Sequence, residues 1–194
     1  MVQADSTNPT SYIGIEIGSS VKRAKATDNH VELCFDNEGS IATTGVTFME
    51  EGKADGDLGE VFNNLKAMDP DGPRTCVISF DPQDDADATN TIRDNLHAAA
   101  TAAGFDVKMV VTTPEAVVCA TPVAFSNKQE LALVVDVGET STTIAIVKQL
   151  DGQLDLVASK RVTSGGNALI EATLVNKMKE IVAADVADVN WDDE

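Results

Sequence analysis

The clearest hydrophobic pattern lies in residues 131–148. An apolar run ends at Asp136, a turn follows at Gly138-Glu139, and a second apolar segment alternates from Thr142 onward. Alternation with period two on both sides of a glycine-containing bend predicts a β-hairpin. We therefore expect two paired strands here, with a carboxylate placed close to the turn.

The same pattern occurs near the start of the chain. Residues 12–17 alternate, with Glu16 near the end of the run, and Gly18, Ser19 and Ser20 precede a second segment up to Thr27. Both stretches read strand, carboxylate, glycine, hydroxyl residues and strand. Such self-similarity predicts an internal duplication.

In the rest of the chain, segments whose apolar residues recur every second position alternate with segments whose apolar residues recur at helical spacing. The helical spacing of apolar residues predicts four helices. Asp84 or Asp85 would cap the second of them, Gly104 would end it in a left-handed conformation, and Pro114 would lie in the first turn of the third. We expect strands at about 12–18, 21–27, 30–36, 45–49, 75–80, 105–111, 131–135, 142–147 and 153–162, and helices at about 58–68, 86–103, 114–123 and 168–184. This order predicts an α/β fold with mixed sheets.

Composition narrows the possible partners. The chain of 194 residues carries a formal charge of −18. This charge argues against binding to nucleic acid or to an anionic membrane, and it favours binding to basic partners. Three scattered cysteines, Cys34, Cys76 and Cys119, are typical of buried, reduced thiols. No apolar stretch approaches the length of a membrane span and the first nine residues are polar, so we expect a cytoplasmic protein.

Several segments in shared order resemble the heat-shock protein 70 chaperone family. Residues 13–20 are similar to its first phosphate loop, G-I-D-L-G-T-T, and residues 133–144 to its second, L-V-x-D-L-G-G-G-T-x-D. Further similar segments are 38–48, 75–80, 103–105, 113–116, 164–167 and 174–175. The resemblance implies a ribonuclease-H-like, actin-like ATPase fold with one complete lobe, 11–125, and a partial second lobe, 126–184. Residues 1–10 would be a flexible lead, and 185–194 a mobile acidic tail carrying Trp191.

The resemblance also implies where a nucleotide would bind. In the family, backbone N–H groups of the two turns cradle phosphates, and carboxylates hold Mg²⁺ and its waters. The corresponding residues are Gly18, Ser19, Ser20, Asp136 and Gly138. Simpler roles also fit, because Asp136 can cap a turn and the two serines can satisfy the hairpin backbone.

Departures from the family pattern predict that these loops are vestigial and unoccupied. Glu16 replaces an aspartate, Glu139 puts an anion where a phosphate would lie, and Thr143 and Thr113 replace carboxylates. The stretch that carries the family's catalytic lysine has no counterpart between Gly56 and Pro73. Phosphoryl transfer depends on positioning and on Mg²⁺, so we expect no catalytic residue, no metal site and no ATP or Mg²⁺ cofactor.

Three functions remain open at this point. The first is a non-catalytic, chaperone-like subunit of a hetero-oligomeric complex, by analogy with the ribosome-associated family member that pairs with a J-protein. In that case a protein partner would complete the sheet of residues 131–162 by strand addition or with a docked helix. The second is a small active ATPase or kinase of the actin-like superfamily. The third is an unrelated α/β domain with a chance similarity.

Overall fold

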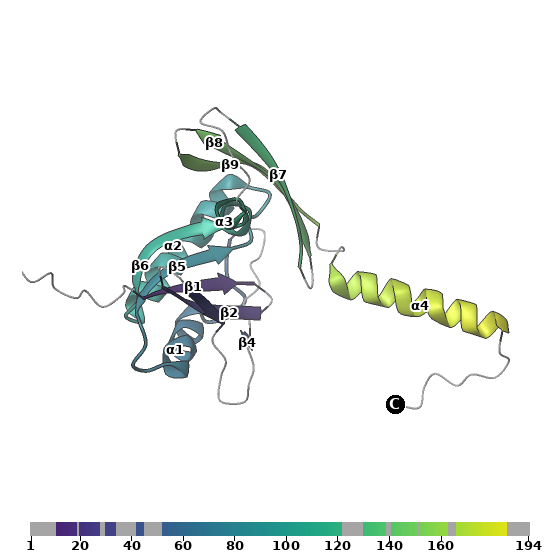
Figure 1. Ribbon diagram of the computed structural model, residues 1–194, viewed down its shortest axis with the longest axis horizontal. Helices are drawn as coiled ribbons and strands as arrows, with labels where there is room; N and C mark the ends of the chain where they lie inside the picture. The colour runs from purple at the N-terminus through teal and green to yellow at the C-terminus, as the bar shows by residue number, and fades with distance from the viewer. Residues whose placement is uncertain are drawn as a thin grey trace, which may run out of the picture.

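The computed structural model describes residues 11–18, 20–27, 30–33, 42–44, 52–121, 130–138, 141–150, 152–162 and 166–185. Within this part, the chain forms two separate β-sheets and four helices (Figure 1). The mixed α/β class predicted from the sequence is therefore confirmed.

The first sheet has six strands in the order β3-β2-β1-β5-β6, with β4 also paired to β2. The antiparallel part is β1 to β4, and β1, β5 and β6 run parallel. The strand bounds are β1 Tyr12–Ile17, β2 Ser20–Thr27, β3 His30–Leu33, β4 Ala42–Thr44, β5 Thr75–Phe80 and β6 Asp106–Thr112. Because β1, β5 and β6 are parallel, their carboxyl ends meet at one edge of the sheet.

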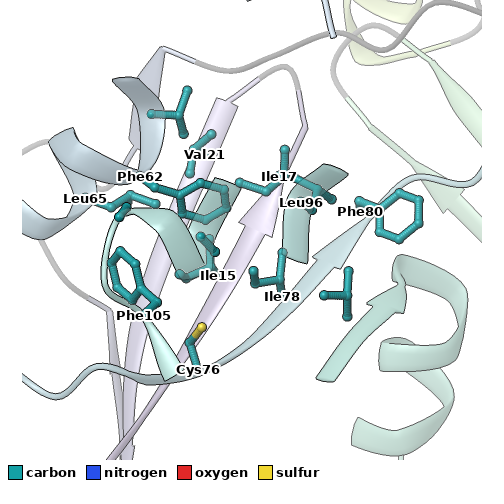
Figure 2. Packing of buried hydrophobic residues seen from close by; sticks show 14 of the residues in the cluster. Ile15, Ile17, Val21, Phe62, Leu65, Cys76, Ile78, Phe80, Leu96 and Phe105 are labelled. Atoms are coloured by element: carbon teal, nitrogen blue, oxygen red, sulfur yellow. The ribbon is translucent and has the colours of Figure 1, made fainter. Parts of the chain in front are cut away.

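Two helices cover one face of this sheet, α1 (Leu58–Met68) and α2 (Ala86–Ala102). The alternation of β1 sends every second side chain into the core between sheet and helices, where the rings of Phe62 and Phe105 pack together (Figure 2). Asp57 caps α1, and Asp85 caps α2 by accepting from the Ala88 N–H at 2.8 Å. Gly104 has φ +92°, as the predicted left-handed stop requires.

The second sheet consists of three antiparallel strands in chain order, β7 (Glu130–Val137), β8 (Thr142–Leu150) and β9 (Gln153–Val162). Helix α3 (Thr113–Ala120) lies between the two sheets in Figure 1. Val118 of α3 packs against Val134 and Val147 on the inner face of the second sheet. The predicted hairpins are thus both present, as β1–β2 and β7–β8.

The other face of the second sheet has no such cover in the described part of the chain. Its apolar side chains are largely exposed, with Leu133 at 70%. The helix that follows in sequence, α4 (Asn167–Asp185), projects away from both sheets in Figure 1. Side chains 169–178 of α4 are all exposed.

Element positions agree closely with the sequence prediction, with a few differences. The short strand β4 was not predicted, and the predicted strand at 45–49 lies outside the described residues, as do Cys34 and the tail with Trp191. Cys76 is buried as expected, but Cys119 is exposed, so the prediction of buried thiols is wrong there. Among the described helices, none combines the length and apolarity that crossing a membrane requires.

Candidate functional site

The candidate site begins at the edge where the parallel strands end. In the sheet register, Ile17 of β1 lies beside Phe80 of β5, which lies beside Thr112 of β6. The residues that follow these three strands are Gly18, Asp81 and Thr113. Ligands of open α/β sheets bind at the carboxyl ends of parallel strands, so this edge is the natural place for a site.

Three carboxylates from three strands or strand ends gather at this edge. Burial raises the pKa of Asp81, and the nearby charges of Asp136 and Glu16 raise it further. Burial likewise raises the pKa of Asp136, followed by the effect of Glu16. Each shift shows that the charged form is disfavoured by loss of water and by like charges. The three carboxylates therefore lie close enough at this edge for each charge to act on the others.

Positively charged and hydroxyl groups offset this charge in part. Lys22 lies directly across from Glu16 in the β1–β2 pair, with Nζ 3.4 Å from Oε2. Lys22 lowers the pKa of Asp136, while a hydrogen bond from Thr113 and the charge of Arg161 lower that of Asp81. Burial and like charges still prevail for both aspartates, since the net shifts are upward.

In the bend between β7 and β8, the backbone N–H of Gly138 forms a hydrogen bond within the bend itself. The N–H of Gly138 donates to the carbonyl of Ser141 at 2.9 Å, and Arg161 Nε donates to Ser141 Oγ at 3.2 Å. A phosphate-binding turn needs backbone N–H groups that are free to point at the anion. At Gly138 that donor is already engaged.

A second set of contacts lies close to this edge. It joins the loop between β5 and α2 to strand β9 of the second sheet. Asp84 accepts from the Arg161 N–H at 2.7 Å and pairs with Lys160, while Ser159 Oγ donates to the Gln83 carbonyl at 2.8 Å. The Lys160 contact is the main reason that the pKa of Asp84 lies below its usual value. These contacts hold β9 against the first sheet and border a cavity of about 500 Å³ between α2, β6 and β9.

The structure places several of the predicted site residues. Gly18 directly follows β1, Asp136 lies on β7 and Gly138 lies in the turn after β7. Ser20 begins β2, where its backbone faces Thr44, whereas Ser19 lies outside the described residues. Glu139, the predicted anion of the second loop, also lies outside them.

The two threonines at lost carboxylate positions are both buried. Thr143 is 2% exposed and lies opposite Asp136 in the β7–β8 register. Thr113 begins α3, whose first turn is closed by Glu115 Oε2, which accepts from the Thr112 N–H at 2.7 Å and from its hydroxyl at 2.8 Å. Both positions are thus filled by neutral side chains. Among the described residues, no group of three side chains of the metal-ligating kinds is arranged to hold an ion.

Three members of this site were not identified from the sequence. Asp81 follows directly after a strand, and this position was an available signal, because ligands of open α/β sheets bind at the carboxyl ends of the strands. The sequence offers both Asp84 and Asp85 as helix caps, but Asp85 is the cap and Asp84 binds β9. Arg161 belongs to the end of an edge strand and carries no local sequence signal.

Comparison with known proteins now defines the class of this chain. A family model described as Hsp70 protein matches residues 87–191, more than half of the sequence. Proteins of this class are chaperone-related and have an actin-like ATPase fold. The chain belongs to the heat-shock protein 70 family, which confirms the resemblance and excludes a chance similarity. No curated protein matches the chain.

Proposed function

We propose that the protein is a non-catalytic member of its family that acts by binding proteins within a larger, hetero-oligomeric complex. In this proposal the first sheet with its helices is a complete actin-like lobe, and the second sheet is part of a second lobe. The analogue is a chaperone-related subunit that has lost ATP turnover and retains the scaffold, as in ribosome-associated or co-chaperone assemblies.

The observation that carries the proposal is the convergence of Glu16, Asp81 and Asp136 where phosphates would lie. Asp81 adds a third anion to the two that the family motifs provide. A triphosphate brought to the same place would meet like charges on partly buried carboxylates, where repulsion is weakly screened. The engaged N–H of Gly138 removes a donor that would offset this repulsion, and the neutral, buried Thr143 replaces a carboxylate that would help to hold Mg²⁺.

The partner is proposed to add to the free edge of β7. In the described part of the chain, β7 pairs on one side only, with β8. An unpaired strand edge offers a row of N–H and C=O groups to a further strand. Strand addition by a different polypeptide would extend this sheet and hold the subunit in its complex.

The catalytic part of the proposal is tested by release of phosphate from Mg²⁺-ATP. We expect no turnover above background and no heat of binding in titration calorimetry with Mg²⁺-ATP. Asp81→Asn should not create turnover, although it removes one anion, since Thr143 and Thr113 still lack carboxylates. Asp106→Asn on the exposed surface is the matched control for charge. Turnover in the native chain that disappears in Asp136→Ala would overturn the proposal and favour an active ATPase.

A further inference from the structure

The two outer strands of the second sheet differ in what lies along their free edges. The sheet has the order β7-β8-β9, so in the described part of the chain β7 and β9 each pair on one side only, with β8. The free side of an outer strand carries backbone N–H and C=O groups that a further strand can bind. Proteins protect such edges with bulges, charged side chains or a covering element.

Strand β9 contains a bulge. Its register shifts between Ile146 and Val147 of β8, which leaves Val157 of β9 without a partner. A bulge interrupts the ladder and increases the local twist, so the edge becomes a poor template for an incoming strand. Residues 154–159 of β9 also border the cavity described above, and α2 and β6 lie across that cavity from this stretch.

The end of β9 is bound by the loop between β5 and α2. Asp84 Oδ1 accepts from the Arg161 N–H at 2.7 Å, which occupies a backbone donor of the edge. Asp84 also pairs with Lys160, and the Gln83 carbonyl accepts from Ser159 Oγ at 2.8 Å. These contacts involve three consecutive residues of β9. A strand arriving here would have to displace the loop before it could form its own hydrogen bonds.

Strand β7 shows the opposite features. Its register with β8 is unbroken from Glu130 to Val137, so it contains no bulge. Its central residues, 131–135, are all apolar and uncharged. Edge protection normally prevents a regular, apolar strand from presenting a free edge of this kind. The free edge of β7 is therefore suited to accept a further strand, and that of β9 is not.

We infer that the β5–α2 loop is an edge guard, which keeps further strands off β9 and so directs strand addition to β7. Asp84 is the main residue of this edge guard, because it is the acceptor in two of the three contacts with β9. The inference rests on the proposed function, since β7 is the edge that the partner is proposed to use. It adds the reason why the sheet takes one partner strand rather than two.

The test uses a synthetic peptide with the sequence of β8, residues 142–150. Because β8 pairs antiparallel with both β7 and β9, the peptide has the side-chain alternation that suits either edge. The full chain is incubated with excess peptide, and hydrogen exchange is measured for fragments of β7 and β9 with and without it. In the unmodified chain we expect exchange to slow on the order of tenfold in β7 only. A peptide of the same composition in shuffled order should slow neither strand.

The edge guard is released in the double variant Asp84→Ala with Ser159→Ala, which eliminates the three contacts described above. We expect the peptide to slow exchange in β9 as well as in β7. The matched control is Asp85→Ala, which removes the same charge from the same loop at the α2 cap. In that variant the peptide should slow β7 only.

Lys160→Glu provides a second way to release the loop, because it places a carboxylate against Asp84, and it should also admit the peptide at β9. Circular dichroism verifies that each variant folds. Slower exchange of β9 in the unmodified chain with peptide would overturn the inference, because the edge would be open with the loop in place. Folded release variants in which β9 does not respond would overturn it as well. Slower exchange of β9 in the release variants, with no response of β7 in any chain, would support the edge guard and contradict the partner site at β7.

Discussion

The two sheets of this protein use similar strands but differ in how their faces are covered. β1 and β5 bury every second side chain under α1 and α2. β7 and β8 bury one set of side chains against α3 and expose an equally apolar set on the other face. Strand pattern alone therefore does not determine burial. The helices available to each sheet decide which apolar residues become core.

This comparison predicts that one and the same substitution has different effects in the two sheets. Val21 and Val147 are each 1% exposed, Val21 in the large core and Val147 in the small cluster under α3. We expect Val21→Ala to lower the free energy of unfolding by about 3 kcal/mol and Val147→Ala by about 1 kcal/mol, because a small cluster relaxes around a cavity more easily. Urea unfolding of the two variants measures both. Equal losses would show that the second sheet is packed as rigidly as the first.

A smaller effect is expected where the two sheets are joined. Asp84→Ala removes the acceptor for the Arg161 N–H and the partner of Lys160. We expect a loss of about 1 kcal/mol, with faster hydrogen exchange confined to β9. The neighbouring Asp85→Ala should cost a similar amount through the α2 cap, with faster exchange at the start of α2 instead. If both variants changed the same segment, the separate roles assigned to these aspartates would be wrong.

The smallest effect concerns the dependence of stability on pH. Asp81 has a raised pKa in the folded state, so above its ordinary value of 3.8 the unfolded chain loses this proton first. Stability should therefore decline as pH rises from about 3.8 through the folded-state pKa. Asp81→Asn should remove part of that decline, as should Asp136→Asn, whose folded-state pKa is also raised.

Asp84 provides the opposite sign for the same experiment. Its pKa is lowered in the folded state, so its contribution is present above 3.8 and is lost as pH falls through the folded-state pKa. Asp84→Asn should therefore flatten the acid side of the curve and leave the decline above 3.8 in place. Urea midpoints over a pH series measure both variants. A decline that survives in Asp81→Asn and Asp136→Asn together would contradict the carboxylate cluster.

Local pattern was sufficient for most elements of this fold. The apolar spacing of residues 58–68 predicted α1 with its observed bounds, and the turn signal at Asp151-Gly152 predicted the start of β9 at Gln153. Both signals are local, because they depend only on residues close together in the sequence. The short strand β4 was missed because its pairing with β2 depends on residues distant in sequence.

The candidate site was only partly predictable for the same reason. Glu16 and Asp136 are recognisable in the sequence because each belongs to a repeated motif that resembles a phosphate loop of the family. Asp81 joins them through the parallel pairing of β1 with β5, which no local window contains. The exposure of the uncovered face of the second sheet and of α4 depends on which helix covers which sheet, and periodicity gives only the apolar side of each element.

The pairing of β1 with β5 also determines the order in which the chain gains structure. Ile13 can meet Cys76 only after all the residues between them have been brought into a closed loop, and that closure reduces chain entropy before any contact compensates for it. The β7–β8–β9 meander needs only neighbouring segments. Contacts between near neighbours form faster than those between distant ones. The small sheet is therefore expected to nucleate early, and closure of the large one to set the overall folding time.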